Sequence, residues 1–181
     1  LKEEYRNYSE KYWESKTFAP SSLIFYLGID QSIPNLNHHT LFFENDLNEH
    51  IDCIYNEKKW PEKPLFYACC PSKTDNSVAP QGKENLFLLM PVAIGINDDD
   101  NSRKKYLMEM LSRIEKHTGV NNLLSKIEFE KSYCVSDFIS DYNAYGGNAY
   151  GLANTLSQTA VLKPKIRNKK IKNLFYTGQL T

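Results

Sequence analysis

Adjacent histidines and adjacent cysteines are the residues in this sequence whose types could most directly support chemistry. His38 and His39 could ligate a metal ion, and Cys69 and Cys70 could ligate a metal or form a redox pair. Each pair lies in a run with strand character, where neighbouring side chains point to opposite faces of a sheet. Two residues of one pair then cannot easily reach the same ion. We therefore predict structural roles for both pairs and no metal site.

Two further segments could support catalysis or close contact with a ligand. Asp75 and Ser77 lie in a polar loop over residues 71–82, where an aspartate could act as a base. Aspartate in such loops mostly forms local turn hydrogen bonds, and we expect that role here. Residues 146–151 contain three glycines. These allow either close approach of the backbone to a ligand or a tight chain reversal before a helix, and the sequence favours neither.

Composition and missing motifs exclude several classes of function. No G-x-G-x-x-G or G-x-x-x-x-G-K-[ST] motif occurs, so the sequence holds no complete cradle for nucleotide phosphates. The 22 basic residues balance the 22 acidic ones, which gives no support for binding to nucleic acid. The cysteines form no C-x-x-C pair and no signal peptide is recognisable, which favours a reducing, cytoplasmic setting. The longest apolar stretch, residues 86–96, is about half the roughly 20 residues that span a bilayer.

Short β-rich runs bounded by turn residues predict one sheet of about five strands, antiparallel or mixed. The runs are Ser22–Ile29, His38–Glu44, Leu65–Cys70, Leu86–Ala93 and Ile127–Cys134. Several of them are continuously apolar, which indicates strands covered on both faces by helices, by a ligand or by another domain. Together with helices packed on the sheet, these strands predict an α+β fold.

Helical periodicity is found in three places. Residues 2–15 carry tyrosines at helical spacing, which predicts an amphipathic helix. The clearest helix begins near Ser102 after three aspartates and ends at Gly119. Its apolar stripe consists of Tyr106, Leu107, Met110, Leu111 and Ile114. A last helix is expected over residues 152–161, before a proline.

These elements predict a division of the chain into four parts. The amphipathic helix within residues 1–20 leads into a main domain over residues 21–162. A basic linker over residues 163–172 holds six Lys and Arg residues, which could touch anionic lipid headgroups, although a solvated linker is the default interpretation. Residues 173–181 resemble a strand with nothing after it to pack against. We therefore expect the chain to be a piece of a longer protein.

Several short motifs follow one another in an order and at spacings that match one protein family. They are Ala19–Ser22, Phe25–Gly28, His38–Thr40, Pro71–Gly82, Leu89–Val92, Gly147–Leu152 and Asn173–Gly178. In this order they resemble the C-terminal, substrate-binding part of bacterial and fungal phytoene desaturases, within the flavin amine oxidoreductase superfamily. The resemblance covers nearly all of the chain, and the order of the motifs is far more specific than any one of them.

The resemblance implies an FAD-dependent oxidoreductase of carotenoid biosynthesis that acts on CH–CH groups. Such an enzyme removes two hydrogens from a polyene such as phytoene and creates a conjugated double bond. In the family, FAD lies in a Rossmann-type domain, and neither its glycine-rich motif nor the Pro/Gly-rich segment that completes the flavin site is present here. Only Gly178 and Thr181 are expected at the edge of the cofactor site. The chain alone should therefore be inactive.

The same resemblance implies that residues 21–162 form the substrate-binding domain, whose sheet roofs an apolar channel. By their position in the matched motifs, the expected channel residues are Phe25, Tyr26, His38, Tyr67, Met90, Asn148 and Tyr150. No catalytic residue can be named. Because the substrate dissolves in the bilayer, the parent enzyme is expected on the cytoplasmic side of the membrane as a peripheral, monotopic protein.

Other functions fit the same residues. Within the family, the alternatives are a desaturase of hydroxylated or C30 carotenoids and a carotenoid isomerase. From a different class, the aromatic richness and the basic segment are also typical of a non-enzymatic module that binds lipids or docks to membranes. The oligomeric state is left open.

Overall fold

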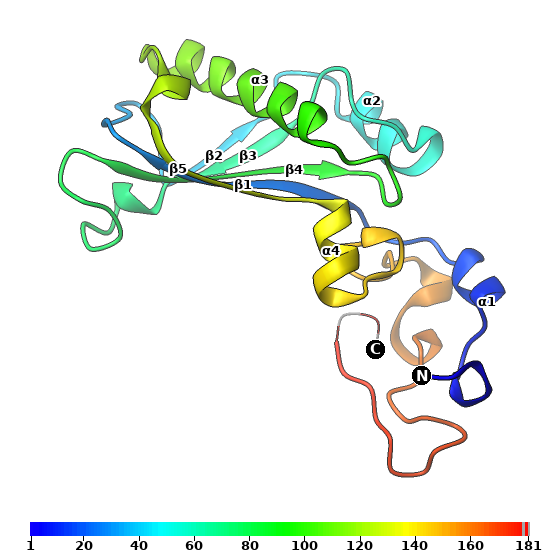
Figure 1. The fold of residues 1–181 in the computed structure, drawn as a ribbon. Coiled ribbons are helices and arrows are strands. Elements are labelled where there is room, and N and C mark those ends of the chain that lie inside the picture. Colours follow the sequence, from blue (N-terminus) through cyan, green and yellow to red (C-terminus); the bar gives the residue numbers. More distant parts are fainter. Residues whose placement is uncertain (179, 181) are drawn as a thin grey trace.

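The computed structural model describes residues 1–178 and 180. Its centre is a five-stranded sheet in the order β2-β3-β4-β1-β5, and all neighbours pair antiparallel (Figure 1). The strands are β1 (Ser21–Ile29), β2 (His39–Phe42), β3 (Phe66–Cys69), β4 (Glu84–Val92) and β5 (Ile127–Tyr133). The α+β class and all five predicted strands are confirmed, with ends shifted by at most two residues.

One face of the sheet is covered by helices. Helix α3 (Asp100–Thr118) lies along this face, and the shorter α2 (Leu47–Asp52) lies on the same side (Figure 1). The side chain of Asp99 caps α3 by accepting a hydrogen bond of 2.8 Å from the amide of Ser102, and Gly119 ends the helix at a φ of 78°. The apolar stripe predicted for this helix is buried throughout. This helix is confirmed.

The core lies between α3 and the sheet because burial alternates along the two longest strands. On β1 every second residue from Leu23 to Ile29 is at most 2% exposed, and on β4 the same holds from Leu86 to Val92. This alternation is that of strands packed on one face. From the continuously apolar runs, we predicted that both faces of the strands are covered. Within the part of the chain that the structure describes, helices cover only one face over its centre.

The sequence did not predict α2, which continues into a π-helical turn, Cys53–Glu57. His50 in α2 is buried and accepts a hydrogen bond from the amide of Leu65 at Nδ1, at 2.9 Å. Its Nε2 therefore carries the proton and donates to the carbonyl oxygen of Pro91, at 2.8 Å. Burial lowers the pKa of His50 despite this second bond. The neutral imidazole thus joins α2 to the end of β4.

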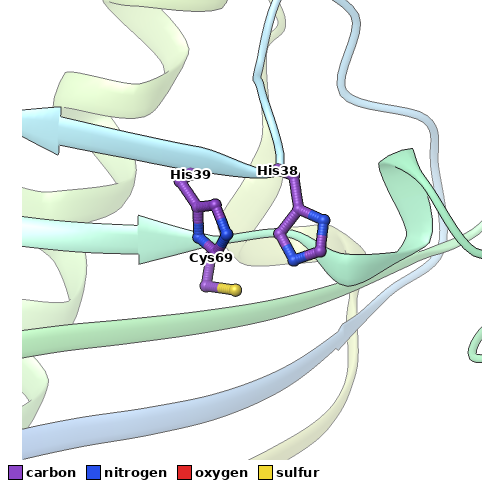
Figure 2. A group of neighbouring side chains, drawn as sticks. All are labelled: His38, His39 and Cys69. Atoms are coloured by element: carbon purple, nitrogen blue, oxygen red, sulfur yellow. The ribbon is translucent and has the colours of Figure 1, made fainter.

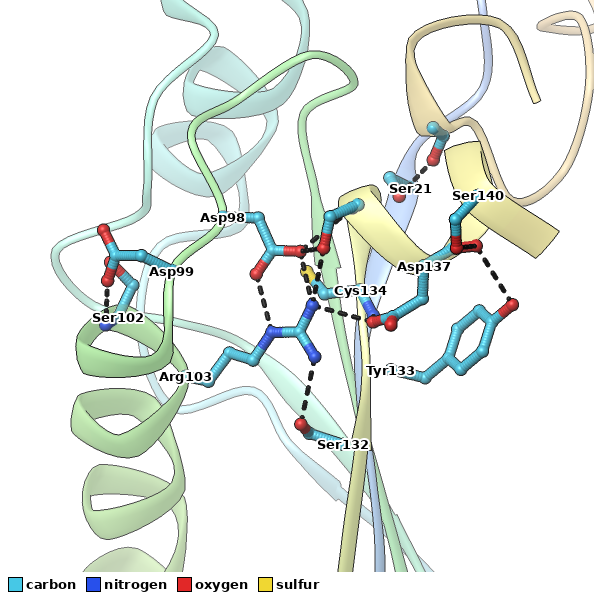
Figure 3. A network of polar contacts seen from close by, with 12 residues as sticks. Ser21, Asp98, Asp99, Ser102, Arg103, Ser132, Tyr133, Cys134, Asp137 and Ser140 are labelled. Atoms are coloured by element: carbon cyan, nitrogen blue, oxygen red, sulfur yellow. Dashed lines mark hydrogen bonds and ion pairs between the residues drawn. The ribbon is translucent and has the colours of Figure 1, made fainter. Parts of the chain in front are cut away.

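An arginine network joins α3 to β5 and to the following helix, α4 (Val135–Tyr142) (Figure 3). Arg103 donates to both carboxylate oxygens of Asp98, at 2.7 and 2.6 Å. It also donates to Asp137 at 2.7 Å and to Ser132 at 3.1 Å. Burial alone would raise the pKa of Asp98, but Arg103 and Ser136 lower it overall. The network therefore holds three elements together at one end of the sheet.

The glycine-rich loop after α4 reverses the direction of the chain and packs tightly against its neighbours. The hydroxyl of Ser21 donates to the carbonyl oxygen of Gly147, at 2.5 Å. Gly147 has a φ of 67°, and a Cβ there would lie 2.5 Å from the carbonyl oxygen of Val135. Only glycine fits this position. Of the two interpretations of this loop, the structure supports the tight reversal.

The predicted helix over residues 2–15 is wrong. The structure has a 3₁₀ turn, Glu3–Tyr5, and a separate short helix, α1 (Glu10–Glu14). Between them the side chain of Asn7 donates to the carbonyl oxygen of Arg167 at 3.0 Å and accepts from the amide of Lys169 at 2.7 Å. These bonds to a distant segment interrupt the local helix.

The predicted last helix, residues 152–161, is also wrong, because two 3₁₀ turns take its place, Leu156–Gln158 and Ala160–Leu162. The side chain of Gln158 accepts from the amide of Thr17 at 3.0 Å and donates to the carbonyl oxygen of Thr17 at 2.8 Å. This pairing with the N-terminal segment replaces helical hydrogen bonds.

The C-terminal segment forms no strand among its described residues. Instead of a strand over residues 173–178, a single bridge joins Arg167 to Phe175. In the basic segment before it, Asn168 is buried and donates to the carbonyl oxygen of Tyr5, at 2.8 Å. The two ends of the chain therefore lie side by side (Figure 1).

Candidate functional site

The second face of the sheet carries apolar side chains that no helix covers over its centre in the described ranges. The register places Tyr26 beside Phe87 and Ile24 beside Leu89, and Leu89 in turn beside Tyr67 of β3. These residues alternate with the core residues and share one face. We call this surface the open face, and define it as Ile24, Tyr26, Leu41, Tyr67, Phe87, Leu89 and Phe129.

A row of rings crosses four strands of the open face. The ring of Phe87 lies 5.3 Å from that of Tyr26 and 6.3 Å from that of Tyr67, and His39 continues the row at 5.9 Å from Tyr67. Several members are widely exposed, with Tyr26 at 45% and Leu41 at 63%. An apolar and aromatic patch of this kind typically marks a binding surface.

Two segments flank the open face. The loop over residues 71–82 projects on this side at one end of the sheet, and α4 lies on the same side at the other end (Figure 1). A hollow of about 380 Å³ lies where the loop meets the sheet. Its lining includes Tyr26, Gly28 and Phe129 from the sheet and Val78 and Pro80 from the loop. The open face is therefore hollowed at its loop end.

Charged side chains border this surface at the hollow, whose lining also includes Lys83 and Glu128. Lys131 is the residue paired with Tyr26 on β5. A hydrogen bond with Cys69, together with burial, raises the pKa of Tyr67 to about 12, so its hydroxyl stays neutral at physiological pH. A surface of aromatic rings and aliphatic side chains can hold an apolar ligand.

The structure brings some of the predicted channel residues together. Tyr26 and Tyr67 both belong to the open face, on opposite sides of Phe87. His38 lies beside them, immediately before β2. Tyr150 is half exposed near the α4 end of the sheet, where its hydroxyl lies 3.5 Å from that of Ser22.

Three predicted channel residues, Phe25, Met90 and Asn148, do not lie on the open face. Phe25 and Met90 are fully buried on the covered face, because strand alternation turns them toward α3. Asn148 is 6% exposed and its side chain is used locally, since it donates to the carbonyl oxygen of Tyr145 at 2.8 Å and accepts from the amide of Gly151 at 2.9 Å. None of the three is available to a ligand on the open face.

The geometric argument against joint metal binding by His38 and His39 is wrong. Strand β2 begins at His39, so alternation does not apply to His38, and the two rings lie 4.2 Å apart. With Cys69 of β3 they form a cluster whose possible ligand atoms all lie within 4.8 Å of one another (Figure 2). This cluster is the part of the described chain where a metal ion could be held.

The neighbouring cysteine behaves as predicted. Cys70 points to the covered side, where it is fully buried and hydrogen bonded to Glu84 at 3.5 Å. Burial raises the pKa of its thiol to about 11. Glu84 itself is 6% exposed and accepts hydrogen bonds from Lys73 and Ser72, which anchor the loop to β4. Cys69 and Cys70 are therefore not a pair for metal or redox chemistry.

The loop aspartate also has the predicted role. The carboxylate of Asp75 accepts from the amide of Ser77 at 2.8 Å and from its hydroxyl at 2.6 Å. These two bonds lower the pKa of Asp75. The turn interpretation of this pair is confirmed.

Of the two residues expected at the edge of a cofactor site, Thr181 lies outside the described residues. Gly178 lines a second hollow of about 350 Å³ between the two ends of the chain, together with Tyr8 and Trp13. Its φ is 136°, and a Cβ built there would meet nothing within 4 Å. The described residues around Gly178 do not form a closely fitting cradle.

Sequence reasoning missed Phe87, Leu41 and Phe129, which contribute much of the open face. Each lies in a predicted strand, but which of two adjacent apolar residues points outward depends on the register and on which side α3 packs. The apolar stripe of α3 does not reveal which strand residues face that helix. The outward-facing residues can be identified only once the strand pairing is known.

No helix in the described ranges combines the length and the apolar character needed to cross a bilayer.

No protein-family model matches the chain. Curated relatives match nearly all of it. A carotenoid 3,4-desaturase of Haloarcula japonica is 46% identical over 176 residues, which are 97% of this chain and 35% of the relative. A zeta-carotene-forming phytoene desaturase of Myxococcus xanthus is 32% identical, over 93% of this chain and 33% of the relative.

A 4,4'-diapophytoene desaturase of Staphylococcus haemolyticus is 29% identical, over 97% of this chain and 36% of the relative. The chain thus spans about a third of the length of the relatives it matches. The motif order that suggested this family agrees with these matches. The chain is therefore homologous, over almost its whole length, to one segment of the carotenoid desaturases.

Proposed function

We propose that the chain is the substrate-binding part of an FAD-dependent carotenoid desaturase, and that the open face is the surface that contacts the polyene. The observation that carries the proposal is the row of aromatic rings across the open face, in a chain homologous to carotenoid desaturases. A polyene is long, apolar and uncharged, and a surface of this composition binds such a molecule through apolar contact.

The residues of this chain would act by position. Tyr26, Phe87 and Tyr67 would lie along the polyene and hold it in register, and the hollow beside the loop would receive part of it. A bound polyene would displace water from the open face. FAD, when bound to the parent protein, would accept the hydrogens. The described residues do not form a site for the flavin by themselves, so no step through the cofactor is assigned to them.

The identity of the substrate forms a second part of the proposal. The sequence motifs favoured phytoene. The relative named as a carotenoid 3,4-desaturase is 46% identical, against 32% for the phytoene desaturase of Myxococcus xanthus. This difference favours a second candidate function, desaturation of a carotenoid that is already more unsaturated than phytoene.

To test this proposal, one carotenoid at a time is given to the longer protein that contains this chain. Membranes that hold either phytoene or a more unsaturated carotenoid are incubated with the purified protein, and products are separated by chromatography and identified by their visible absorbance. New absorbance at longer wavelength, with flavin bound to the protein, is the expected result. Bound flavin without new polyene bands from either carotenoid would contradict the proposal.

We further propose that the parent protein rests on the membrane surface from the cytoplasmic side. The support is the segment over residues 156–172, where Leu156 and Val161 are 95% and 80% exposed and five lysines follow them. Exposed apolar side chains beside basic ones are typical of contact with anionic lipid. A non-enzymatic lipid-binding module would share this property, so membrane contact does not separate it from an enzyme.

Sedimentation with vesicles tests this contact. The chain should sediment with vesicles rich in anionic lipid and less with neutral ones. A Lys165→Glu, Lys172→Glu variant should lose most of this binding, whereas Lys104→Glu, Lys105→Glu on α3 is the matched control. Equal binding by the two variants would contradict the proposed surface. Vesicle binding by a longer protein that fails the desaturation test would favour the lipid-binding alternative.

A further inference from the structure

The cluster of His38, His39 and Cys69 has the composition of a transition-metal site. It lies at the end of β2 and β3 beside the open face, and its three side chains converge (Figure 2). Imidazole nitrogen and thiolate sulfur are preferred ligands of Zn²⁺ and of similar divalent ions. Three protein ligands with a fourth position open is the pattern of zinc sites that also bind a small molecule.

The surroundings of the two imidazoles favour coordination. Nδ1 of His38 lies 2.6 Å from Oγ1 of Thr74, whose hydroxyl donates to the carbonyl oxygen of Pro71. The threonine oxygen can therefore accept the Nδ1 proton of His38. This arrangement leaves the lone pair of Nε2 free, which is the usual state of a metal-bound histidine.

His39 has the matching partner on the neighbouring strand. Its Nδ1 lies 2.5 Å from the hydroxyl of Tyr67, whose oxygen can accept the Nδ1 proton. Oxygen atoms thus hold Nδ1 of both rings, and Nε2 of each is the available ligand. Such outer partners orient metal ligands in proteins.

The sulfur can reach the same point because of its position on the sheet. Cys69 pairs with His39 across β2 and β3, which places both side chains on one face. Unlike the buried Cys53, Cys70 and Cys134, Cys69 is partly exposed. The possible ligand atoms lie within 4.8 Å of one another. Small rotations of these side chains, all at least partly exposed, can shorten this to the separations of a tetrahedral site, which are about 3.5 Å.

We infer that His38, His39 and Cys69 bind a divalent transition-metal ion of the Zn²⁺ type, with one coordination position left open toward the open face. Coordination releases the proton of the Cys69 thiol to water. The inference is independent of the proposed carotenoid function, since it concerns only the affinity of this cluster for a metal.

Titration of the folded chain with Co²⁺ tests the inference. Thiolate-to-cobalt charge transfer in the near ultraviolet and intense visible bands of tetrahedral Co²⁺ are expected, and Zn²⁺ should abolish both. Cys69→Ser should remove the charge-transfer band. His38→Gln or His39→Gln should weaken binding at least about tenfold, and Thr74→Ala, which removes only the outer partner, by about 10-fold or more.

Matched controls are His117→Gln and Cys53→Ser, which change a histidine and a cysteine outside the cluster and should bind Co²⁺ like the wild type. Alkylation mapped by mass spectrometry gives a second measurement on the unmodified chain. Zn²⁺ should slow the reaction of Cys69 with iodoacetamide. Absence of a charge-transfer band together with unchanged alkylation of Cys69 would overturn the inference, as would equal loss of binding in the controls.

Discussion

The two faces of the sheet differ in what their side chains contact, although they alternate along the same strands. On the covered face, Phe25 and its neighbours on β4 pack against α3 and are fully buried. On the open face, Tyr26 is 45% exposed, and its ring lies 5.3 Å from that of Phe87. The covered face therefore stabilises the fold, and the open face remains available for binding. Adjacent residues with similar side chains can have these two different roles.

The largest expected difference in stability is between substitutions of two neighbouring residues of β1. Phe25→Ala leaves a cavity under α3 and should reduce the free energy of unfolding by about 3–5 kcal/mol. Tyr26→Ala removes a half-exposed ring and should cost about 1 kcal/mol or less. Urea unfolding followed by circular dichroism measures both. Equal losses in the two variants would break the distinction between the faces.

The next effect concerns the arginine network at the end of the covered face. Arg103 is 13% exposed and pairs with Asp98, which is 2% exposed. Arg103→Met leaves that carboxylate buried and unpaired, and should reduce stability by about 3 kcal/mol. The control is Lys104→Met on the same helix, which is exposed and should change stability by about 0.5 kcal/mol or less. A neutral result for Arg103→Met would show that the network does not hold α3 to β5.

A smaller effect is expected from pH, through His50 on the covered side. Burial lowers the pKa of His50 in the folded chain. As the pH falls below about 6.5, the unfolded chain binds a proton that the folded chain resists, so stability decreases. Unfolding midpoints in urea should therefore fall between pH 7.5 and pH 5.5. His50→Gln should show a weaker dependence over this range, and an unchanged dependence would assign it to other groups.

The smallest effect is expected on the open face. Leu41 is 63% exposed, and Leu41→Ser should change the free energy of unfolding by about 0.5 kcal/mol or less. Its neighbour on β2, Phe42, is 6% exposed, and Phe42→Ser is the contrasting variant, expected to lose several kcal/mol. Thermal unfolding of both chains compares them. A loss for Leu41→Ser as large as for Phe42→Ser would mean that the open face is part of the core.

Local sequence patterns were sufficient to predict the five strands and α3. The strands were recognisable from β-rich runs between turns, and α3 from its cap at Asp99, its stripe and Gly119. The ends of the chain could not be predicted in the same way. There Asn7 and Gln158 bond to backbone groups about 140 or more residues away, and these bonds prevail over local helix propensity.

The candidate site was predicted only in part because its residues differ from core residues by orientation alone. Motif matching selected Phe25 and Tyr26 together, and the strand geometry places them on opposite faces. His38 and His39 were separated on the same geometric rule, which fails because β2 begins one residue later than expected. The missing information was which face of β1 is covered in the first case and where β2 begins in the second.

The most direct test of the account is the effect of the open face on carotenoid conversion. In the longer protein that contains this chain, Tyr26→Ser with Phe87→Ser removes the centre of the ring row, and Tyr142→Ser on α4 is the control with an exposed tyrosine outside the open face. We expect the double variant to keep its fold and its flavin but to form product at least roughly tenfold more slowly, while the control converts carotenoid like the wild type. Wild-type conversion by the double variant would contradict the open face as the polyene surface.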